Sequence, residues 1–196
     1  TVEIEQVDED FSSDGGLIAF KQLDSILGWT ESFSQLIQHS GRDHSAKSML
    51  QQRVFGIIAG YEDQNDHDSL RSDPIFKLIA DRSPSDRDLA SQPTLSRFEN
   101  AITAGTLLQM EEWFLDRFVE SFSEAPDRIT LDMDTFDDPT HGMQQLTFFH
   151  GYYDQYQYQV RVITCAENDM TVLPVLLYGS AAVSLGAYDD IVRVIN

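Results

Sequence analysis

The spacing of apolar residues divides the chain into a helical first part and a strand-rich second part. In the first part apolar residues recur every three or four positions, as on a helix with one buried side. Three such stripes stand out: Leu17, Phe20, Leu23, Ile26 and Leu27; Met49, Leu50, Val54, Ile57 and Ile58; and Leu108, Trp113, Phe114, Phe118 and Phe122. After Arg128 the period shortens to two, which is typical of strands. The pattern predicts an α+β protein, with a mostly helical region over 1–124 and a second region over 125–196.

Local signals predict where several helices begin and end. Gly28 follows the first stripe and is expected to end that helix, because glycine adopts the left-handed conformation of a C-cap easily. Thr30 is expected to cap a short second helix, and Ser45 a longer one that ends near Gly60. Asp73 followed by Pro74 is the combination of an N-cap with proline in the first turn.

The second region begins with a predicted strand whose two faces differ. Ile129, Leu131 and Met133 point to one face, and Thr130, Asp132 and Asp134 to the other. An acidic turn over 137–142, a strand over 146–149 and an aromatic strand over 156–164 are expected to follow as a β-meander. An apolar run over 172–178 and a helix over 189–196 complete the pattern.

Composition limits the function classes. The chain has 13 Lys and Arg against 33 Asp and Glu, a net charge of −20, and only three lysines. Nucleic-acid binding is normally carried by clustered Lys and Arg, so this balance disfavours DNA as a partner of the chain alone. The single cysteine, Cys165, excludes an internal disulfide and is interpreted as a buried thiol. No membrane segment or secretory signal is found, and a cytoplasmic location is expected.

The densest group of acidic residues follows the predicted first strand: Asp132, Asp134, Asp137 and Asp138. Two-metal phosphoryl transfer needs several carboxylates, and residues two apart on a strand share a face. From the residues alone, Asp134 could be either a metal ligand or a surface carboxylate. Asp137 and Asp138 are interpreted as a solvated turn before Pro139.

Histidine and tyrosine residues offer further candidates. His67 lies among Asp63, Asp66 and Asp68, but the spacing matches neither a calcium-binding EF-hand loop nor a zinc helix, so capping and hydrogen bonding are the preferred interpretation. His141 and His150 are interpreted as turn and strand-end residues. Four tyrosines could stack on bases, although cross-strand aromatic pairs are the commoner arrangement; they are Tyr152, Tyr153, Tyr156 and Tyr158.

Three blocks carry a family resemblance: QQRVFGIIAGYEDQNDHDSLRSDPIFKL (51–78), DLASQPTLSRFEN (88–100) and ITLDMDTFDDPTHGMQQ followed by FFHGYYDQYQY (129–158). Together, and in this order, they resemble bacterial insertion-sequence transposases of the DDE type. The resemblance implies a helical region that handles transposon-end DNA, followed by the first strands and helix of a ribonuclease-H-like domain. Such enzymes use three acids and two Mg²⁺ ions, or Mn²⁺, to cleave DNA and transfer the cut strand.

The resemblance assigns the first acid, both catalytic and metal-binding, to Asp134, with Asp132 as the weaker candidate. It also shows two departures. Thr135 and Phe136 follow Asp134 where the family usually has Ala-Thr or a similar pair, and neither the second nor the third acid is found. The sequence is therefore expected to be truncated before the second acid, inactive alone, and without a tightly bound metal.

Other interpretations remain open at this stage. The chain could be a repurposed acidic remnant that acts as a protein-interaction or structural subunit, with a homodimer or another protein as its partner. It could equally be a folded part of a longer enzyme.

Overall fold

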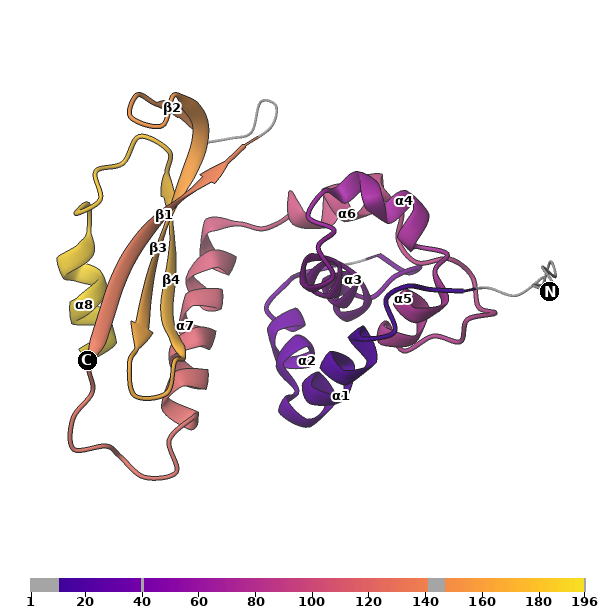
Figure 1. The fold of residues 1–196 in the computed structure, drawn as a ribbon, viewed down its shortest axis with the longest axis horizontal. Coiled ribbons are helices and arrows are strands. Elements are labelled where there is room, and N and C mark those ends of the chain that lie inside the picture. Colours follow the sequence, from indigo (N-terminus) through magenta and orange to yellow (C-terminus); the bar gives the residue numbers. More distant parts are fainter. Residues whose placement is uncertain (1–10, 40, 141–146, 196) are drawn as a thin grey trace, which may run out of the picture. The chain divides into compact units, whose positions relative to one another are not determined.

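The computed structural model describes residues 11–39, 41–140 and 147–195, and the chain forms two compact units, Thr1–Thr106 and Leu107–Asn196. The first unit is helical and the second contains a sheet (Figure 1). This division falls earlier than the predicted boundary at 124/125, because most of a long helix, α7 (Ala104–Glu120), belongs to the sheet unit. The α+β class is confirmed.

The helical unit is built from short helices that pack around an apolar cluster. Its core side chains are Leu17, Phe55, Leu70, Phe76, Ile79, Ala80 and Leu89. The elements are α1 (Leu17–Leu27), α2 (Trp29–Ser34), α3 (Ala46–Ile58), the 3-10 helix η1 (Gln64–Asp66), α4 (His67–Leu70), α5 (Pro74–Ile79) and α6 (Gln92–Glu99).

The predicted ends of three helices are confirmed. Gly28 has φ +66° and its N–H donates to the Asp24 carbonyl at 2.7 Å. The Ser45 hydroxyl accepts from the Ser48 amide, and the Asp73 carboxylate accepts from two amides of α5. The cap predicted at Thr30 is wrong: α2 begins at Trp29, and Thr30 donates through its amide and its hydroxyl to the Asp24 carboxylate. The left-handed turn at Gly28 brings these two side chains together.

Helix α1 does not bury its predicted stripe. Leu17 is buried, whereas Phe20, Leu23, Ile26 and Leu27 are exposed, Ile26 to 82%. The apolar period thus identifies the helix correctly, but most of its apolar side remains outside the core of this unit.

In helix α3, too, the buried side differs from the predicted one. Gln51 and Gln52 are fully buried, while Ile57 and Ile58, predicted to face inward, are exposed. The Gln52 amide donates to the Ala90 carbonyl at 2.9 Å, and the Gln51 amide meets the Thr30 hydroxyl. These hydrogen bonds make burial of the two amides tolerable.

The sheet unit has four antiparallel strands with β3 at the centre. Strand β1 pairs along one edge of β3, and β2 and β4 pair along the other. This order differs from the predicted meander, because β3 is long enough to accept two partners on one side. The elements are α7, β1 (Leu131–Pro139), β2 (Phe148–His150), β3 (Gln155–Cys165), β4 (Thr171–Tyr178) and α8 (Ala187–Ile195).

The acidic turn predicted from 137 onward is wrong where the structure describes it. Asp137 and Asp138 lie in β1, opposite Gln159 and Tyr158 of β3. Continuous pairing with β3 extends the strand to Pro139. The last two residues of the predicted turn, His141 and Gly142, lie outside the described residues.

One face of the sheet is covered by α7 and α8. Phe118 of α7 packs with Ile163, Cys165, Val172 and Leu173 of the sheet, and Val194 of α8 joins the same cluster. Cys165 is a buried thiol in a strand, as predicted. Leu108, predicted on the buried side of α7, is exposed.

Candidate functional site

Strand β1 holds its carboxylates on two different faces. Asp132 and Asp134 are exposed and lie opposite Thr164 and Val162 of β3, whose side chains share their face. Asp137 points to the other face, where its Oδ2 accepts from the Gln155 amide at 2.8 Å. Side chains alternate between the two faces of a strand, so acidic residues that are close together in the sequence lie on different faces of β1.

The Asp134 carboxylate is exposed to solvent and makes few contacts with the described residues. Its Oδ1 accepts a hydrogen bond of 2.7 Å from the amide of the next residue, Thr135. Within the described residues, Asp134 forms no ion pair. A carboxylate in this state can offer an oxygen to a hard cation such as Mg²⁺.

The described residues do not by themselves fit a two-metal centre. Across 11–39, 41–140 and 147–195, no three side chains of His, Cys, Asp or Glu converge on one point. Two divalent ions about 4 Å apart need carboxylates from several elements. Asp134 fits as one such ligand, and the other ligands are not assembled beside it by these residues.

Glu167 is an acidic residue that was not among the candidates predicted from the sequence. It lies in the turn between β3 and β4, and both of its oxygens accept from the Thr130 amide, at 3.0 and 2.9 Å. These bonds, with a further one from the Cys165 thiol at 3.2 Å, lower the pKa of Glu167 to about 2. The carboxylate fixes the start of β1 against the neighbouring turn.

His67 has a structural environment. Its ring is fully buried, packs edge-on against Phe76, and accepts at Nε2 from the Arg53 guanidinium at 3.1 Å. Burial, and then the charge of Arg53, lower the pKa of His67 to about 4. The ring is therefore neutral at ordinary pH, and hydrogen bonding, the preferred interpretation, is what the structure shows.

The aromatic residues around β2 contact one another, and Phe149 with Tyr156 forms a cross-strand pair of the predicted kind, whereas Tyr152 and Tyr156 are exposed and not part of the core. Phe149 lies directly opposite Tyr156 in the register and their rings are 5.6 Å apart. His150 and Tyr153 pair at 5.1 Å, and Tyr152 contacts Tyr153.

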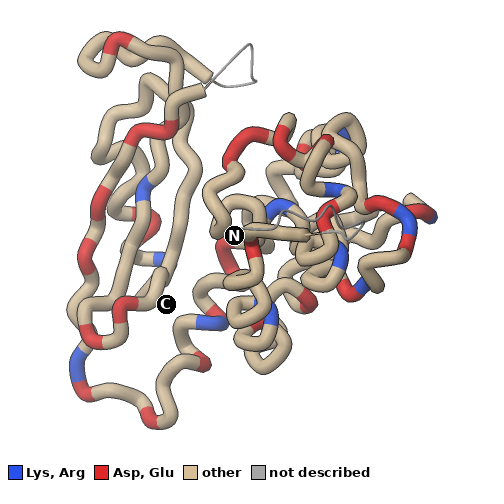
Figure 2. Tube along the Cα trace, turned by 45° about the vertical axis from the view of Figure 1, so that its right-hand side comes forward, with Lys and Arg blue, Asp and Glu red and all other residues tan. Residues whose placement is uncertain are grey.

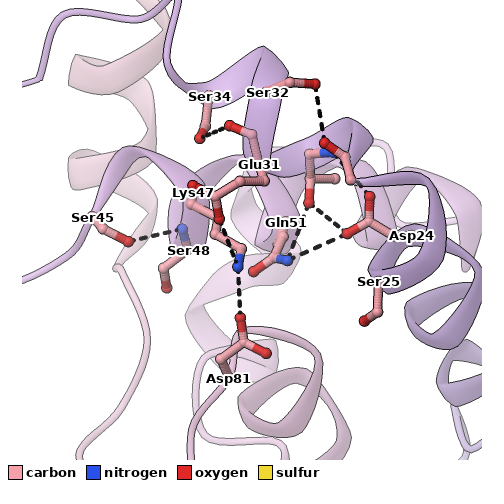
Figure 3. A network of polar contacts seen from close by, with 12 residues as sticks. Asp24, Ser25, Glu31, Ser32, Ser34, Ser45, Lys47, Ser48, Gln51 and Asp81 are labelled. Carbon is pink, nitrogen blue, oxygen red and sulfur yellow. Dashed lines mark hydrogen bonds and ion pairs between the residues drawn. The ribbon is translucent and has the colours of Figure 1, made fainter.

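The lysines are held within the helical unit. Lys47 bridges Glu31 and Asp81, at 2.9 and 3.1 Å, beside the buried contacts of Gln51 and Asp24 (Figure 3). Lys21 pairs with Asp81 at 2.8 Å, and Lys77 donates to the carbonyls of Pro84 and Asp86. These cations stabilise the fold and leave little positive charge for a polyanion.

A shallow hollow of the helical unit is lined by Arg82, Asp86 and Arg87. Arg82 donates to the Asp88 carbonyl and to His44 Nδ1, and Arg87 pairs with Asp43. Acidic residues outnumber basic ones along both units (Figure 2). Both arginine side chains of this hollow therefore already form hydrogen bonds or an ion pair within the chain.

Comparison with known families agrees with this fold. Residues 1–171 match the family described as Transposase DDE domain group 1. The match covers most of the chain, which therefore belongs to this family of DDE transposases. Neither the curated proteins nor the solved structures contain a match. None of the helices in the described ranges is long and apolar enough to cross a membrane.

The three sequence blocks that carry the family resemblance have structural roles. Asp73 caps α5, Leu89 and Leu95 are buried, and the Leu89 amide donates to the Arg71 carbonyl at 2.9 Å. The blocks over 51–78 and 88–100 thus build the helical unit. The block over 129–158 forms β1, β2 and part of β3.

Proposed function

We propose that this chain acts in DNA transposition by contributing Asp134 as the first metal-binding carboxylate of a strand-cleavage and strand-transfer site. The observation that carries the proposal is the position of Asp134: it is exposed on the first strand of a transposase domain and hydrogen-bonded only to the adjacent amide among the described residues. Asp132, one pleat earlier on the same face, is the alternative ligand.

The polypeptide of these 196 residues is proposed to lack cleavage activity by itself. A two-metal reaction requires further carboxylates beside Asp134. The described residues do not place any such group of carboxylates there. Mg²⁺ or Mn²⁺ would then bind weakly, since a single carboxylate leaves most of the coordination sphere to water. Transposon-end DNA is the expected substrate of the complete site.

Metal binding at Asp134 can be tested without any activity. Mn²⁺ is titrated into the protein while amide signals are followed by NMR, because the paramagnetic ion broadens nearby signals. Selective broadening at Thr135 and Val162, lost in Asp134→Asn and retained in Asp132→Asn, supports the assignment. Equal broadening in the wild type and in Asp134→Asn contradicts it.

Activity is tested separately. Labelled duplexes that carry the transposon ends are incubated with the protein and Mn²⁺. The expected result is no strand-specific nicking. Nicking that disappears in Asp134→Asn would contradict the proposed inactivity of the polypeptide and support the role of Asp134.

A second candidate function is that of an acidic protein-interaction subunit. The observation in its favour is that the three lysines contact carboxylates or carbonyls of the chain itself, in a protein of net charge −20. A gel shift with transposon-end DNA separates the two candidates. Binding that weakens steeply as salt rises favours a DNA-binding transposase, and absence of binding at low salt favours the protein-interaction subunit.

A further inference from the structure

The residues before α1 include the one Asp-Gly pair of the sequence, Asp14-Gly15, and the sequence has no Asn-Gly pair. In an Asp-Gly pair the backbone nitrogen of the glycine can attack the carboxyl carbon of the aspartate side chain. Glycine permits this attack because it has no Cβ that blocks the approach. Asp14-Gly15 is therefore the pair of this chain at which such a rearrangement is least hindered by the following side chain.

The structure leaves the attacking nitrogen of Gly15 accessible. Gly15 and Gly16 form an exposed turn directly before α1. Apart from its chain neighbours, no atom lies within 4 Å of the position that a Cβ of Gly15 would take. Among the described residues, the Gly15 amide donates no hydrogen bond. The backbone here has room to form a ring and loses no hydrogen bond of this amide in doing so.

A second pair with a small following residue, Asp24-Ser25, lies in a different environment. It is inside α1, where helical hydrogen bonds fix the backbone. The Asp24 carboxylate also accepts from the amide and the hydroxyl of Thr30. The Ser25 nitrogen therefore cannot turn toward the Asp24 carboxyl carbon while the helix is intact. The fold thus separates a protected pair from an open one.

We propose that Asp14 is a modification site, at which the folded protein converts aspartate to isoaspartate. The Gly15 nitrogen attacks Cγ of the protonated Asp14 carboxyl group, and the new bond closes a five-membered succinimide. The carboxyl hydroxyl leaves with the proton of the nitrogen as one water molecule. Water then adds to the ring carbonyl that came from the Asp14 main chain and breaks its bond to the nitrogen.

The product joins Asp14 to Gly15 through Cγ and carries a free α-carboxylate. One water is released and one is consumed, so the mass of the chain is unchanged and no other reactant is needed. The site is distant in sequence from Asp134, and the modification does not depend on the proposed function.

Isomerisation would change the contacts that hold the start of α1. The Asp14 carbonyl accepts from the Leu17 amide at 2.9 Å, and Asp14 Oδ2 accepts from the Tyr61 hydroxyl at 3.1 Å. The rearrangement lengthens the main chain by one carbon and exchanges the roles of these two carboxyl-derived groups. Leu17 is the residue of α1 in the apolar core of the helical unit. Isoaspartate at position 14 is therefore expected to destabilise this unit.

The test incubates the folded protein in neutral buffer for several weeks and digests samples with trypsin. Isoaspartate is measured in the peptide that ends at Lys21, as a second chromatographic peak of equal mass whose fragment ions show the Cγ linkage. We expect this peak to grow with time, preceded by a minor species that is lighter by one water. The melting temperature of the incubated protein should fall as the peak grows.

Two alanine variants of the turn give a matched comparison. Gly15→Ala places a methyl group beside the attacking nitrogen and should slow the conversion severalfold. Gly16→Ala changes the next residue, whose surroundings are equally open, and should leave the rate unchanged. Both variants should fold, because neither Cβ meets another group and Gly16 has helical backbone angles.

Three results would overturn the proposal. The first is absence of isoaspartate at Asp14 in the folded protein when the same protein in urea forms it. The second is an equal rate in Gly15→Ala and in the wild type. The third is isoaspartate at Asp24 to the same extent as at Asp14, since the fold would then not select the site.

Discussion

Arg161, at the centre of β3, is fully buried and donates to the carboxylate of Asp190 in the first turn of α8. The same guanidinium donates to the carbonyls of Val183 and Leu185. One buried cation therefore ties the sheet to the segment that precedes α8 and to α8 itself. Loss of the ion pair between Arg161 and Asp190 should therefore loosen both the segment before α8 and α8 itself.

Asp190→Ala is expected to destabilise the sheet unit by about 3 kcal/mol, because it leaves a buried guanidinium without its counter-charge. Adding Arg161→Leu to Asp190→Ala should recover part of this loss, since the uncompensated charge is then gone and the exposed carbonyl segment can hydrate. The measurement is urea unfolding followed by Trp113 fluorescence in a Trp29→Phe background. Arg128→Leu, an exposed change, should stay within about 0.5 kcal/mol. A double variant less stable than Asp190→Ala would contradict the explanation.

Glu167 should make the sheet unit sensitive to acid. Its folded-state pKa is lowered to about 2 by the Thr130 and Cys165 hydrogen bonds, below the value of about 4.3 expected in an unfolded chain. The stabilisation is therefore present above about pH 4.3 and is lost as pH falls toward about 2. The stability difference between wild type and Glu167→Gln, measured by urea unfolding, should shrink over this range. Glu124→Gln is the control, and a difference independent of pH would contradict the role.

His67 predicts a second pH dependence, in the helical unit. Burial and Arg53 lower its folded-state pKa to about 4, whereas the unfolded value is about 6.5. The unfolded chain then binds a proton first as pH falls, so stability is complete above about pH 6.5 and declines down to about pH 4. His67→Gln should be less stable at neutral pH by about 1–3 kcal/mol, and its stability should vary less over this interval. An equal decline in both proteins would exclude His67 as the cause.

Gly56 is expected to resist replacement by alanine. It lies inside α3, where alanine usually stabilises a helix by up to about 1 kcal/mol. A Cβ at this position would meet His67 Cε1 at 2.9 Å, and the ring is buried and cannot move away easily. Gly56→Ala should therefore destabilise by about 1–3 kcal/mol, as overpacking does.

Gly105→Ala in α7 is the matched control for this glycine, because its Cβ would find only Thr103 Oγ1 at 3.8 Å. It should be neutral or stabilising. The melting temperatures of both variants are measured by thermal unfolding. A Gly56→Ala variant that melts at a higher temperature than the wild type would show that the His67 ring moves aside to accept the methyl group.

The sequence determined the local features of this protein. Helix ends at Gly28, Ser45 and Asp73 follow from backbone groups satisfied within a few residues, so neighbouring residues suffice to specify them. The alternation of β1 likewise places Asp132 and Asp134 on one face wherever the strand lies. The family followed from motif blocks that build the helical unit and the first strands, and Asp134 as a metal ligand stays a prediction.

Only the tertiary structure decided which side of each element is buried. Gln51 and Gln52 are inside and Ile57 is outside because distant groups, at Thr30 and Ala90, satisfy the buried amides. The central place of β3, the extension of β1 through Asp138, and the bonds of Glu167 and Arg161 depend on partners up to 37 residues away. The spacing of apolar residues in the sequence indicates that one side of a helix or strand is apolar. Which partner covers it depends on long-range contacts that a local pattern does not contain.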